Sequence, residues 1–233
     1  ATVLYPDATN RAPDSCILFP MLLEIRAVAP FFKNGFLLGC ETTREAVVID
    51  PGDEAQELIH LIHIHRLTVG YILLTHAHMD HVSGVARLKA ATGASIGVHR
   101  DDLFLYDSAV QQGLMFGYKV EPPPKPDFLY QVGVPLTFGN YQVHVHHTPG
   151  HSPGGVALQV GATGTAGSDI FVGDTLFAGS IGRTDLPGGD TQTLIDSIRT
   201  VLFGFGDAAV VYPGHGPQTT IGEERRGNPF LQE

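Results

Sequence analysis

The stretch THAHMDH, at residues 75 to 81, places three of the chain's 12 histidines and one aspartate within six consecutive positions. In an extended segment, residues two apart point the same way, so His76 and His78 can contact one cation from the same side. Asp80 and His81 follow directly and project toward a neighbouring point. Polar side chains this close together need hydrogen-bond partners or a metal. The pattern therefore predicts two adjacent half-sites for metal ions, and the fold must form around them.

The residues on either side of this motif predict where it lies in the fold. The apolar segment YILLTH, at residues 71 to 76, predicts a buried strand that ends at the motif. Apolar residues recur at helical spacing from Val82, and Gly93 provides a stop. We therefore predict a helix whose first turn contains Asp80 and His81, where an acidic side chain also suits the helix dipole.

Short apolar segments separated by turns fill the rest of the chain. The first three, MLLEIRAVAP, FFKNGFLLGC and EAVVID, predict an antiparallel sheet with turns at Asn34-Gly35 and at residues 41–43. Asp53 is expected to cap a helix that runs to Arg66, and residues 101–126 are expected to be rich in loops. Later strands are predicted at ASIGV, YQVHVHH, GVALQV, DIFVG and AAVVYPG, with a helix at TQTLIDSIRTVLF. This alternation predicts a layered α/β fold.

Composition excludes several classes of function. The chain has 233 residues, of which 43% are hydrophobic, so it can bury a substantial core. A formal net charge of −10, with only 14 lysines and arginines, lacks the basic surface that nucleic-acid binding requires. No apolar run approaches the roughly 18 residues of a membrane span. We expect neither a nucleic-acid partner nor a membrane span.

Residues 1–20 are predicted to be an N-terminal extension to a domain that spans residues 21–233. The extension lacks a basic segment followed by an apolar one, so it does not predict a secretory signal. Cys16 and Cys40 form neither a CxxC pair nor a disulfide framework, which fits a reducing compartment. The predicted location is the cytoplasm, and both cysteines are expected to be small buried hydrophobes.

Three later segments offer further metal ligands at strand ends. They are HTPGHSPGG with His151, FVGDTLF with Asp174, and YPGHGP with His215. In each segment, a turn of small residues lets the backbone come close to neighbouring residues, and one polar side chain projects from the strand end. These residues are candidates to complete both half-sites.

The motifs THAHMDH, TPGHSPG, FVGDTLF and YPGHG, in that order, resemble those of the metallo-β-lactamase superfamily from about Phe31 to the C-terminus. The resemblance implies a four-layer αββα sandwich with metals at the edge of its two sheets. It implies one metal at His76, His78 and His151, a second at Asp80, His81 and His215, and Asp174 as a bridge between them.

This ligand set also points to a chemistry. Three neutral imidazoles suit zinc or ferrous iron, and a bridging carboxylate suits a pair of divalent ions, so we expect two ions, with zinc first and iron or manganese as alternatives. A water shared by ions about 3.5–4 Å apart is deprotonated near neutral pH and becomes a nucleophile. Asp80 is a candidate to orient this hydroxide or accept its proton. The resemblance also implies that Asp50, in VVIDPGD, supports the metal ligands through a contact outside the coordination shell, although it also suits a turn before Pro51.

Within the superfamily, the chain most resembles the glyoxalase II group, the hydroxyacylglutathione hydrolases, and their short bacterial members in particular. The resemblance lies in VVIDPGD, THAHMDHVSG, HTPGHSPGG, LFAGSIGRTDLPGGD and GEERRGNPFL. It implies hydrolysis of a small-molecule acyl thioester, such as S-lactoylglutathione. Typical members have a longer C-terminal helical region with basic glutathione contacts, whereas only 18 residues follow His215 here.

Alternatives remain open. The segment GSIGRTDLPGGD also resembles the persulfide dioxygenases, whose single iron would lie at His76, His151 and Asp174. A lactonase or other ester hydrolase, or a metal-binding protein without catalysis, are further possibilities. Lactamases that share HxHxDH lack a bridging carboxylate, so Asp174 disfavours them.

Two other groups of side chains have competing interpretations. Arg183 is a candidate for binding a substrate carboxylate, but it can equally pair with Asp185. His99, at a strand end, is a candidate to line the pocket, and His147, before the TPGH turn, is a candidate to support a metal ligand. The three histidines of IHLIHIHR, residues 59 to 66, are expected to lie on a solvated helix face.

Overall fold

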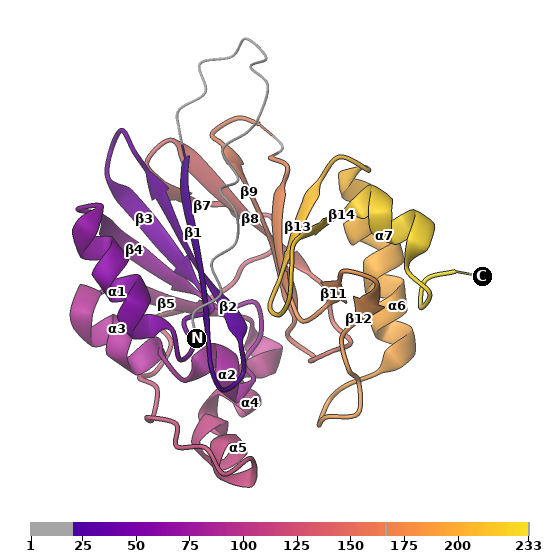
Figure 1. The fold of residues 1–233 in the computed structure, drawn as a ribbon, viewed down its shortest axis with the longest axis horizontal. Coiled ribbons are helices and arrows are strands. Elements are labelled where there is room, and N and C mark those ends of the chain that lie inside the picture. The colour runs from indigo at the N-terminus through magenta and orange to yellow at the C-terminus, as the bar shows by residue number, and fades with distance from the viewer. Residues whose placement is uncertain (1–20, 166, 233) are drawn as a thin grey trace.

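A computed structural model describes residues 21–165 and 167–232 of the chain. These residues form two six-stranded sheets that pack face to face, with helices outside each sheet (Figure 1). The predicted four-layer αββα sandwich is therefore confirmed. The predicted N-terminal extension, with Cys16, lies outside the described residues, while Cys40 is a buried free thiol as expected.

The first sheet contains strands β1 to β6 in chain order. β1 to β3 pair antiparallel as predicted, whereas β3 to β6 pair parallel, so their carboxyl ends meet at one edge. Ile49 pairs with Leu73, and each strand runs from there into a loop at that edge. The bounds are β1 Met21–Val28, β2 Lys33–Cys40, β3 Glu45–Ile49, β4 Thr68–Leu73, β5 Ser95–Val98 and β6 Phe128–Leu129.

The second sheet has the strand order β14-β13-β10-β9-β8-β7. β10 and β13 are parallel and the other neighbours antiparallel, so β8, β10 and β13 all end at the edge that the first sheet also presents. A separate hairpin, β11 with β12, follows β10. The bounds are β7 Leu136–Phe138, β8 Tyr141–His147, β9 Val156–Ala162, β10 Asp169–Gly173, β11 Leu176–Phe177, β12 Ser180–Ile181, β13 Val210–Pro213 and β14 Thr219–Thr220.

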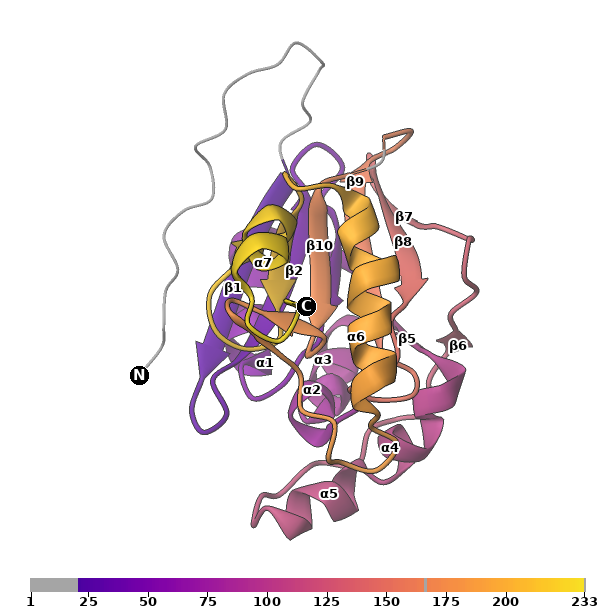
Figure 2. The ribbon, with the colours of Figure 1, turned by 90° about the vertical axis from the view of Figure 1, so that its right-hand side faces the viewer.

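Helices form the outer layers. α1 and α3 cover the first sheet, and α6 and α7 cover the second, as the turned view shows (Figure 2). None of the helices that the structure describes is both long and apolar enough to cross a membrane. The bounds are α1 Ala55–Ile64, α2 Met79–Val82, α3 Val85–Thr92, α4 Leu103–Asp107, α5 Ala109–Met115, α6 Thr191–Thr200 and α7 Ile221–Gly227, with 3-10 turns at Arg100–Asp102 and Leu202–Phe205.

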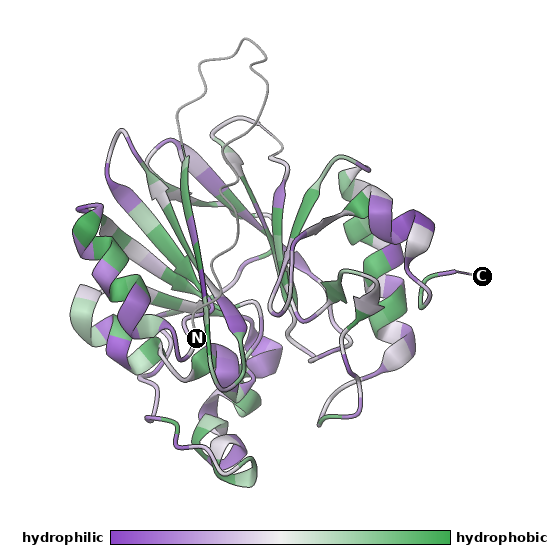
Figure 3. Cartoon of the chain, viewed as in Figure 1, coloured by the Kyte–Doolittle hydropathy of each residue, from purple (hydrophilic) through white to green (hydrophobic). Residues whose placement is uncertain are grey.

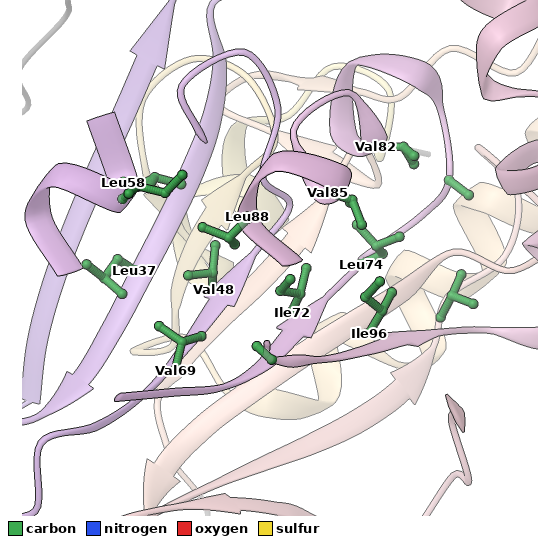
Figure 4. Close-up of a cluster of buried hydrophobic side chains, with 14 of the residues drawn as sticks. Leu37, Val48, Leu58, Val69, Ile72, Leu74, Val82, Val85, Leu88 and Ile96 are labelled. Carbon is green, nitrogen blue, oxygen red and sulfur yellow. The ribbon is translucent and has the colours of Figure 1, made fainter. Parts of the chain in front are cut away.

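Three apolar clusters hold the layers together. Between the first sheet and its helices, Leu58 and Leu88 pack among strand residues such as Ile72 (Figure 4). Between the sheets, Phe171 stacks on Tyr212 at 4.8 Å between ring centroids. A third cluster lies between the second sheet and α6. Figure 3 shows apolar residues along the strands of both sheets and a mixture of polar and apolar residues on the helices outside them, and each fully buried large side chain contributes about 1.5–3 kcal/mol.

Two sequence predictions in the first half of the chain are wrong. Asn34-Gly35 does not form a turn, because both residues lie inside β2 and the chain reverses before Lys33. Gly35 is needed there for space, since a Cβ on it would lie 2.0 Å from Glu54 Oε1. Asp53 does not cap α1, which begins after Glu54; its carboxylate instead accepts hydrogen bonds from Ser83 and Tyr118.

Two further predictions needed correction. The helix expected from Asp80 to Gly93 is divided into α2 and α3, although Gly93 ends it as predicted. Residues 101–126 contain α4 and α5 as well as loops. These helices are too short to show a clear helical period, and they form because residues such as Leu105 and Tyr106 are buried in the core.

Candidate metal centre

Loops from both sheets meet at one edge of the sandwich. The segment after β4 carries the THAHMDH motif, and the segments after β8, β10 and β13 carry the three later candidates. Parallel strand direction causes this convergence, because each of these loops follows a carboxyl end at the same edge. The seven predicted side chains lie together there: His76, His78, Asp80, His81, His151, Asp174 and His215.

His76, His78 and His151 form the first cluster. The Nε2 atom of His151 lies 2.9 Å from His78 Nδ1 and 3.2 Å from His76 Nε2. The three ring planes are nearly perpendicular to one another, at 81–84°. Nitrogen lone pairs lie in the ring planes, so such rings can aim them at one point. The nitrogen separations are close to the roughly 3.3 Å between ligands of a tetrahedral zinc with Zn–N bonds of about 2.0–2.1 Å.

The protonation of this cluster suits a metal. Burial lowers the pKa of His76 well below its usual range and lowers the pKa of His78 to about 3. His151 donates its Nδ1 proton to the carbonyl oxygen of Arg183 at 2.7 Å, which leaves the lone pair on Nε2. His76 and His78 are therefore neutral at pH 7, which is the form that binds a metal.

Asp80, His81 and His215 form the second cluster. Asp80 Oδ2 lies 3.2 Å from His215 Nε2 and 3.8 Å from His81 Nε2. Burial opposes a charge on His81, but Asp80, Asp50 and Asp174 together raise its pKa to about 10. Burial likewise opposes ionisation of Asp80, and His81 and His215 outweigh it to lower that pKa to about 2. A concentration of carboxylates around one imidazole attracts a divalent cation, which would replace the imidazole's proton.

Asp174 lies between the clusters. Its Oδ2 is 3.8 Å from His151 Nε2 and 3.6 Å from His215 Nε2, while its Oδ1 is 3.5 Å from His81 Nε2. Burial opposes its charge, yet His81 and other imidazoles hold its pKa well below the usual range. Asp174 Oδ1 and His81 Nε2 are buried and have no hydrogen-bond partner among the described residues. Divalent metal ions fit this site, because they would satisfy these buried donor atoms with suitable nitrogen and oxygen ligands.

Asp50 lies behind the second cluster. Its carboxylate accepts hydrogen bonds from the backbone and side chain of Thr75, at 2.7 and 2.5 Å, and its Oδ2 lies 3.0 Å from His81 Nδ1. Its backbone has a φ of 49°, a left-handed conformation that aspartate tolerates better than most residues. Contact with Nδ1 turns Nε2 of His81 toward the centre of the site.

Asp102 joins the two loops of the first cluster, and no sequence motif marks it. It is 0% exposed and accepts hydrogen bonds from Ala77 N, Ser152 Oγ and Gly154 N, at 3.0, 2.8 and 2.6 Å. Ala77 lies between His76 and His78, and Ser152 follows His151. The segment had been predicted as loop, and a single acidic residue there has no distinguishing motif.

Among the described residues, His99, Asp101 and His147 also place possible ligand atoms within 4.8 Å of one another, but this group is less suited to an ion. The rings of His99 and His147 stack at 4.3 Å and 14°, so their lone pairs lie in nearly parallel, separate planes and cannot meet at one ion in this arrangement. His60 and His63 are exposed on α1 as predicted, and His65 is half-buried.

A pocket of about 410 Å³ opens beside the second cluster. Arg183 lines it, but its guanidinium also forms two hydrogen bonds with Asp185, at 2.7 and 2.8 Å. The pairing of Arg183 with Asp185 that the sequence left open is therefore present, and Arg183 also faces the pocket. The other lining residues are Asp174, Phe177, Ser180, His215 and Gly216.

Comparison with known proteins identifies the family. A model described as the metallo-beta-lactamase superfamily matches residues 28–215. The chain belongs to this superfamily. It is 40% identical over 213 residues to the hydroxyacylglutathione hydrolase GloC of Haemophilus influenzae, a match that covers 91% of this chain and 98% of that protein.

Solved members of the superfamily have similar folds. The chain is similar to the B3 metallo-beta-lactamase BLEG-1, with a TM-score of 0.81 and 35% identity over 91% of this chain and 100% of that one. It is also similar to TTHA1623 in a di-iron-bound form, with a TM-score of 0.77 and 41% identity over 88% and 98% of the two chains. The chain described here is a metal-dependent hydrolase, as its own sequence predicts.

Substitution of Gly214 by alanine tests how closely the site is packed. A Cβ there would lie 2.2 Å from Asp174 Oδ1 and 2.7 Å from His81 Cε1, so we expect Gly214→Ala to displace both side chains and lower bound metal at least tenfold. Elemental analysis after dialysis measures this. Gly204→Ala, whose Cβ would meet no atom within 4 Å, is the control; equal metal retention in the two variants would contradict the close packing.

Proposed function

We propose that the chain is a dinuclear metal hydrolase that cleaves the thioester of S-acylglutathione-type substrates. The position of the Asp174 carboxylate carries the proposal, since one oxygen lies 3.8 Å from a histidine of the first cluster and 3.6 Å from one of the second. A carboxylate so placed suits two ions that share a ligand. The 40% identity to a hydroxyacylglutathione hydrolase supports the substrate class.

The metal is proposed to be zinc, with iron as the first alternative. The first half-site would be His76, His78 and His151, and a set of three imidazole nitrogens suits zinc. The carboxylates of the second half-site accept harder ions as well, and a structural relative is described in a di-iron-bound form.

The chain's own residues prepare the site for hydrolysis. Two bound divalent ions would supply a water that is activated near neutral pH and an electrophile for the acyl oxygen. Asp80, with a pKa of about 2, stays ionised and can orient that water by accepting a hydrogen bond. Asp50 fixes the ring of His81 through its 3.0 Å contact. The hydrogen bond to the Arg183 carbonyl does the same for His151.

Arg183 is proposed to bind a carboxylate of the thiol carrier. It lines the pocket next to Asp174, and about 410 Å³ falls within the usual volume range for small-molecule sites. Its side chain is exposed, so it can leave Asp185 and reach a substrate. The backbone carbonyl of Arg183 holds His151, so that contact does not involve the guanidinium.

A persulfide dioxygenase remains the competing function, because His76, His151 and Asp174 also form a two-histidine, one-carboxylate set. The second cluster favours the hydrolase. His215 contributes nothing to a mononuclear iron at that set, yet it lies 3.2 Å from Asp80 and 3.6 Å from Asp174.

Loss of a ligand should abolish turnover without unfolding the chain. We expect His76→Ala and Asp174→Ala to lower kcat for S-lactoylglutathione at least about 1000-fold, because His76 is a proposed ligand of the first metal and Asp174 a proposed ligand of both. Thiol release measures the rate, and circular dichroism checks the fold. His60→Ala is the matched control, since that side chain is exposed on α1.

Assays of the wild-type chain with other substrates, together with oxygen uptake, separate the competing functions. Thioester hydrolysis by the wild-type chain supports the proposal. Hydrolysis confined to lactones or β-lactams, or oxygen uptake with glutathione persulfide instead of hydrolysis, contradicts it. A ligand variant that keeps most of its kcat would contradict the site.

The role of Arg183 has its own test. We expect Arg183→Ala to raise KM for S-lactoylglutathione roughly tenfold with little change in kcat, because a charge-assisted contact to a remote carboxylate contributes to binding alone. Arg183→Lys should recover part of the loss, and Asp185→Asn should leave KM unchanged or lower it. Unchanged KM in Arg183→Ala would contradict the contact.

A further inference from the structure

Two buried polar neighbours at the start of β2 take no part in the proposed chemistry. Lys33 is 1% exposed and Asn34 is 2% exposed. Successive residues of a strand point to opposite sides, so the two side chains reach different parts of the molecule. Burial of two such groups is costly unless each has partners, and these partners lie around the second metal half-site.

Lys33 reaches the loop that holds Asp50. Its ammonium group donates to the carbonyl oxygen of Asp50 and lies 2.5 Å from the carboxylate of Glu54, which is also 1% exposed. Asp50 has the left-handed backbone described above, and its carboxylate lies 3.0 Å from His81 Nδ1. Lys33 therefore stabilises the backbone of the residue that orients His81.

Asn34 reaches across to the second sheet. Its backbone N–H donates to Gly214 O at 2.6 Å, and its Nδ2 donates to Pro213 O at 3.0 Å and to Gly216 O at 2.8 Å. These three acceptors surround His215 in the sequence, and Lys33 forms an isolated bridge with His215. The turn that carries His215 is thus attached to β2 of the first sheet.

We propose that Lys33 and Asn34 are positioning residues for the second metal half-site. They set the spacing between His81, which the first sheet supplies, and His215, which the second sheet supplies. The inference rests on the proposed dinuclear site. It explains why an Asn-Gly pair stands inside a strand: Asn34 supplies the donors for the His215 turn.

The first half-site has a separate support. Asp102 joins the loop of His76 and His78 to the loop of His151 through its three hydrogen bonds. None of the hydrogen bonds of Lys33 or Asn34 goes to these loops. The affinities of the two half-sites should therefore respond to different substitutions.

Zinc titration against a chelating indicator tests this separation, with two dissociation constants expected for the wild-type chain. Asn34→Ala should raise one dissociation constant about 10–100-fold, which is the usual effect of removing a group that orients a ligand. The other dissociation constant should stay within twofold of the wild-type value. Asn34→Asp should lose as much, because it keeps the shape but cannot donate to two carbonyls. Asn140→Ala, on the turn between β7 and β8, is the control and should change neither constant.

Double substitutions identify the half-site that is affected. If Asn34 acts through His215, Asn34→Ala should add less than a twofold loss of zinc affinity in a His215→Ala background. In a His78→Ala background it should still weaken the remaining second half-site about 10–100-fold. Asp102→Asn should show the opposite pattern. It should add less than a twofold loss of zinc affinity in a His78→Ala background and weaken the remaining half-site in a His215→Ala background.

Lys33 needs a paired substitution, because removal of one partner would leave Glu54 as a buried unpaired charge. Lys33→Met combined with Glu54→Gln should raise the same zinc dissociation constant that Asn34→Ala raises. Thermal unfolding of each apo-protein shows whether the variants fold.

The outcomes distinguish this inference from the proposed function. Two zinc ions in the wild-type chain, with both constants unchanged in folded Asn34→Ala and Asn34→Asp, would overturn the inference and leave the hydrolase proposal standing. Equal weakening of both constants would overturn it too. A single zinc ion in the wild-type chain would instead contradict the dinuclear site itself.

Discussion

The carboxylate of Asp174 faces imidazoles that come from both sheets, and the rest of the site is arranged around that contact. Its oxygens lie 3.5–3.8 Å from His81, His151 and His215. Such a contact requires the ends of two sheets to meet within a few ångströms. The aromatic core between the sheets, with Phe171 stacked on Tyr212 at 4.8 Å, contributes to that separation. Packing far from the metals thus bears directly on their coordination.

The two halves of the site differ electrostatically although they share Asp174. Burial keeps His76 and His78 neutral, since nothing beside them compensates a positive charge fully. In the second half, carboxylates raise the pKa of His81 to about 10. The first half therefore offers the neutral imidazoles of His76 and His78, and the second offers a negative environment that must exchange a proton for a metal ion. This asymmetry is consistent with separate supports for the two halves.

The sequence predicted the parts of the molecule that local spacing determines. The THAHMDH motif, the strands that precede it and the layered fold follow from patterns within about ten residues of one another. Its errors lie where distant segments decide the conformation. Asn34-Gly35 has the composition of a turn but lies in β2, because Asn34 bonds to a turn 179 positions away along the chain. Asp102 depends on partners 25 to 52 positions away, which no local pattern reveals.

The number of metal ions that one chain holds tests the central claim most directly. Elemental analysis of the full chain, purified without added metal and then titrated with zinc, should give two ions per chain, with thioester hydrolysis appearing as the second binds. One tightly held iron per chain, no second binding event, and oxygen uptake in place of thioester hydrolysis would contradict the account.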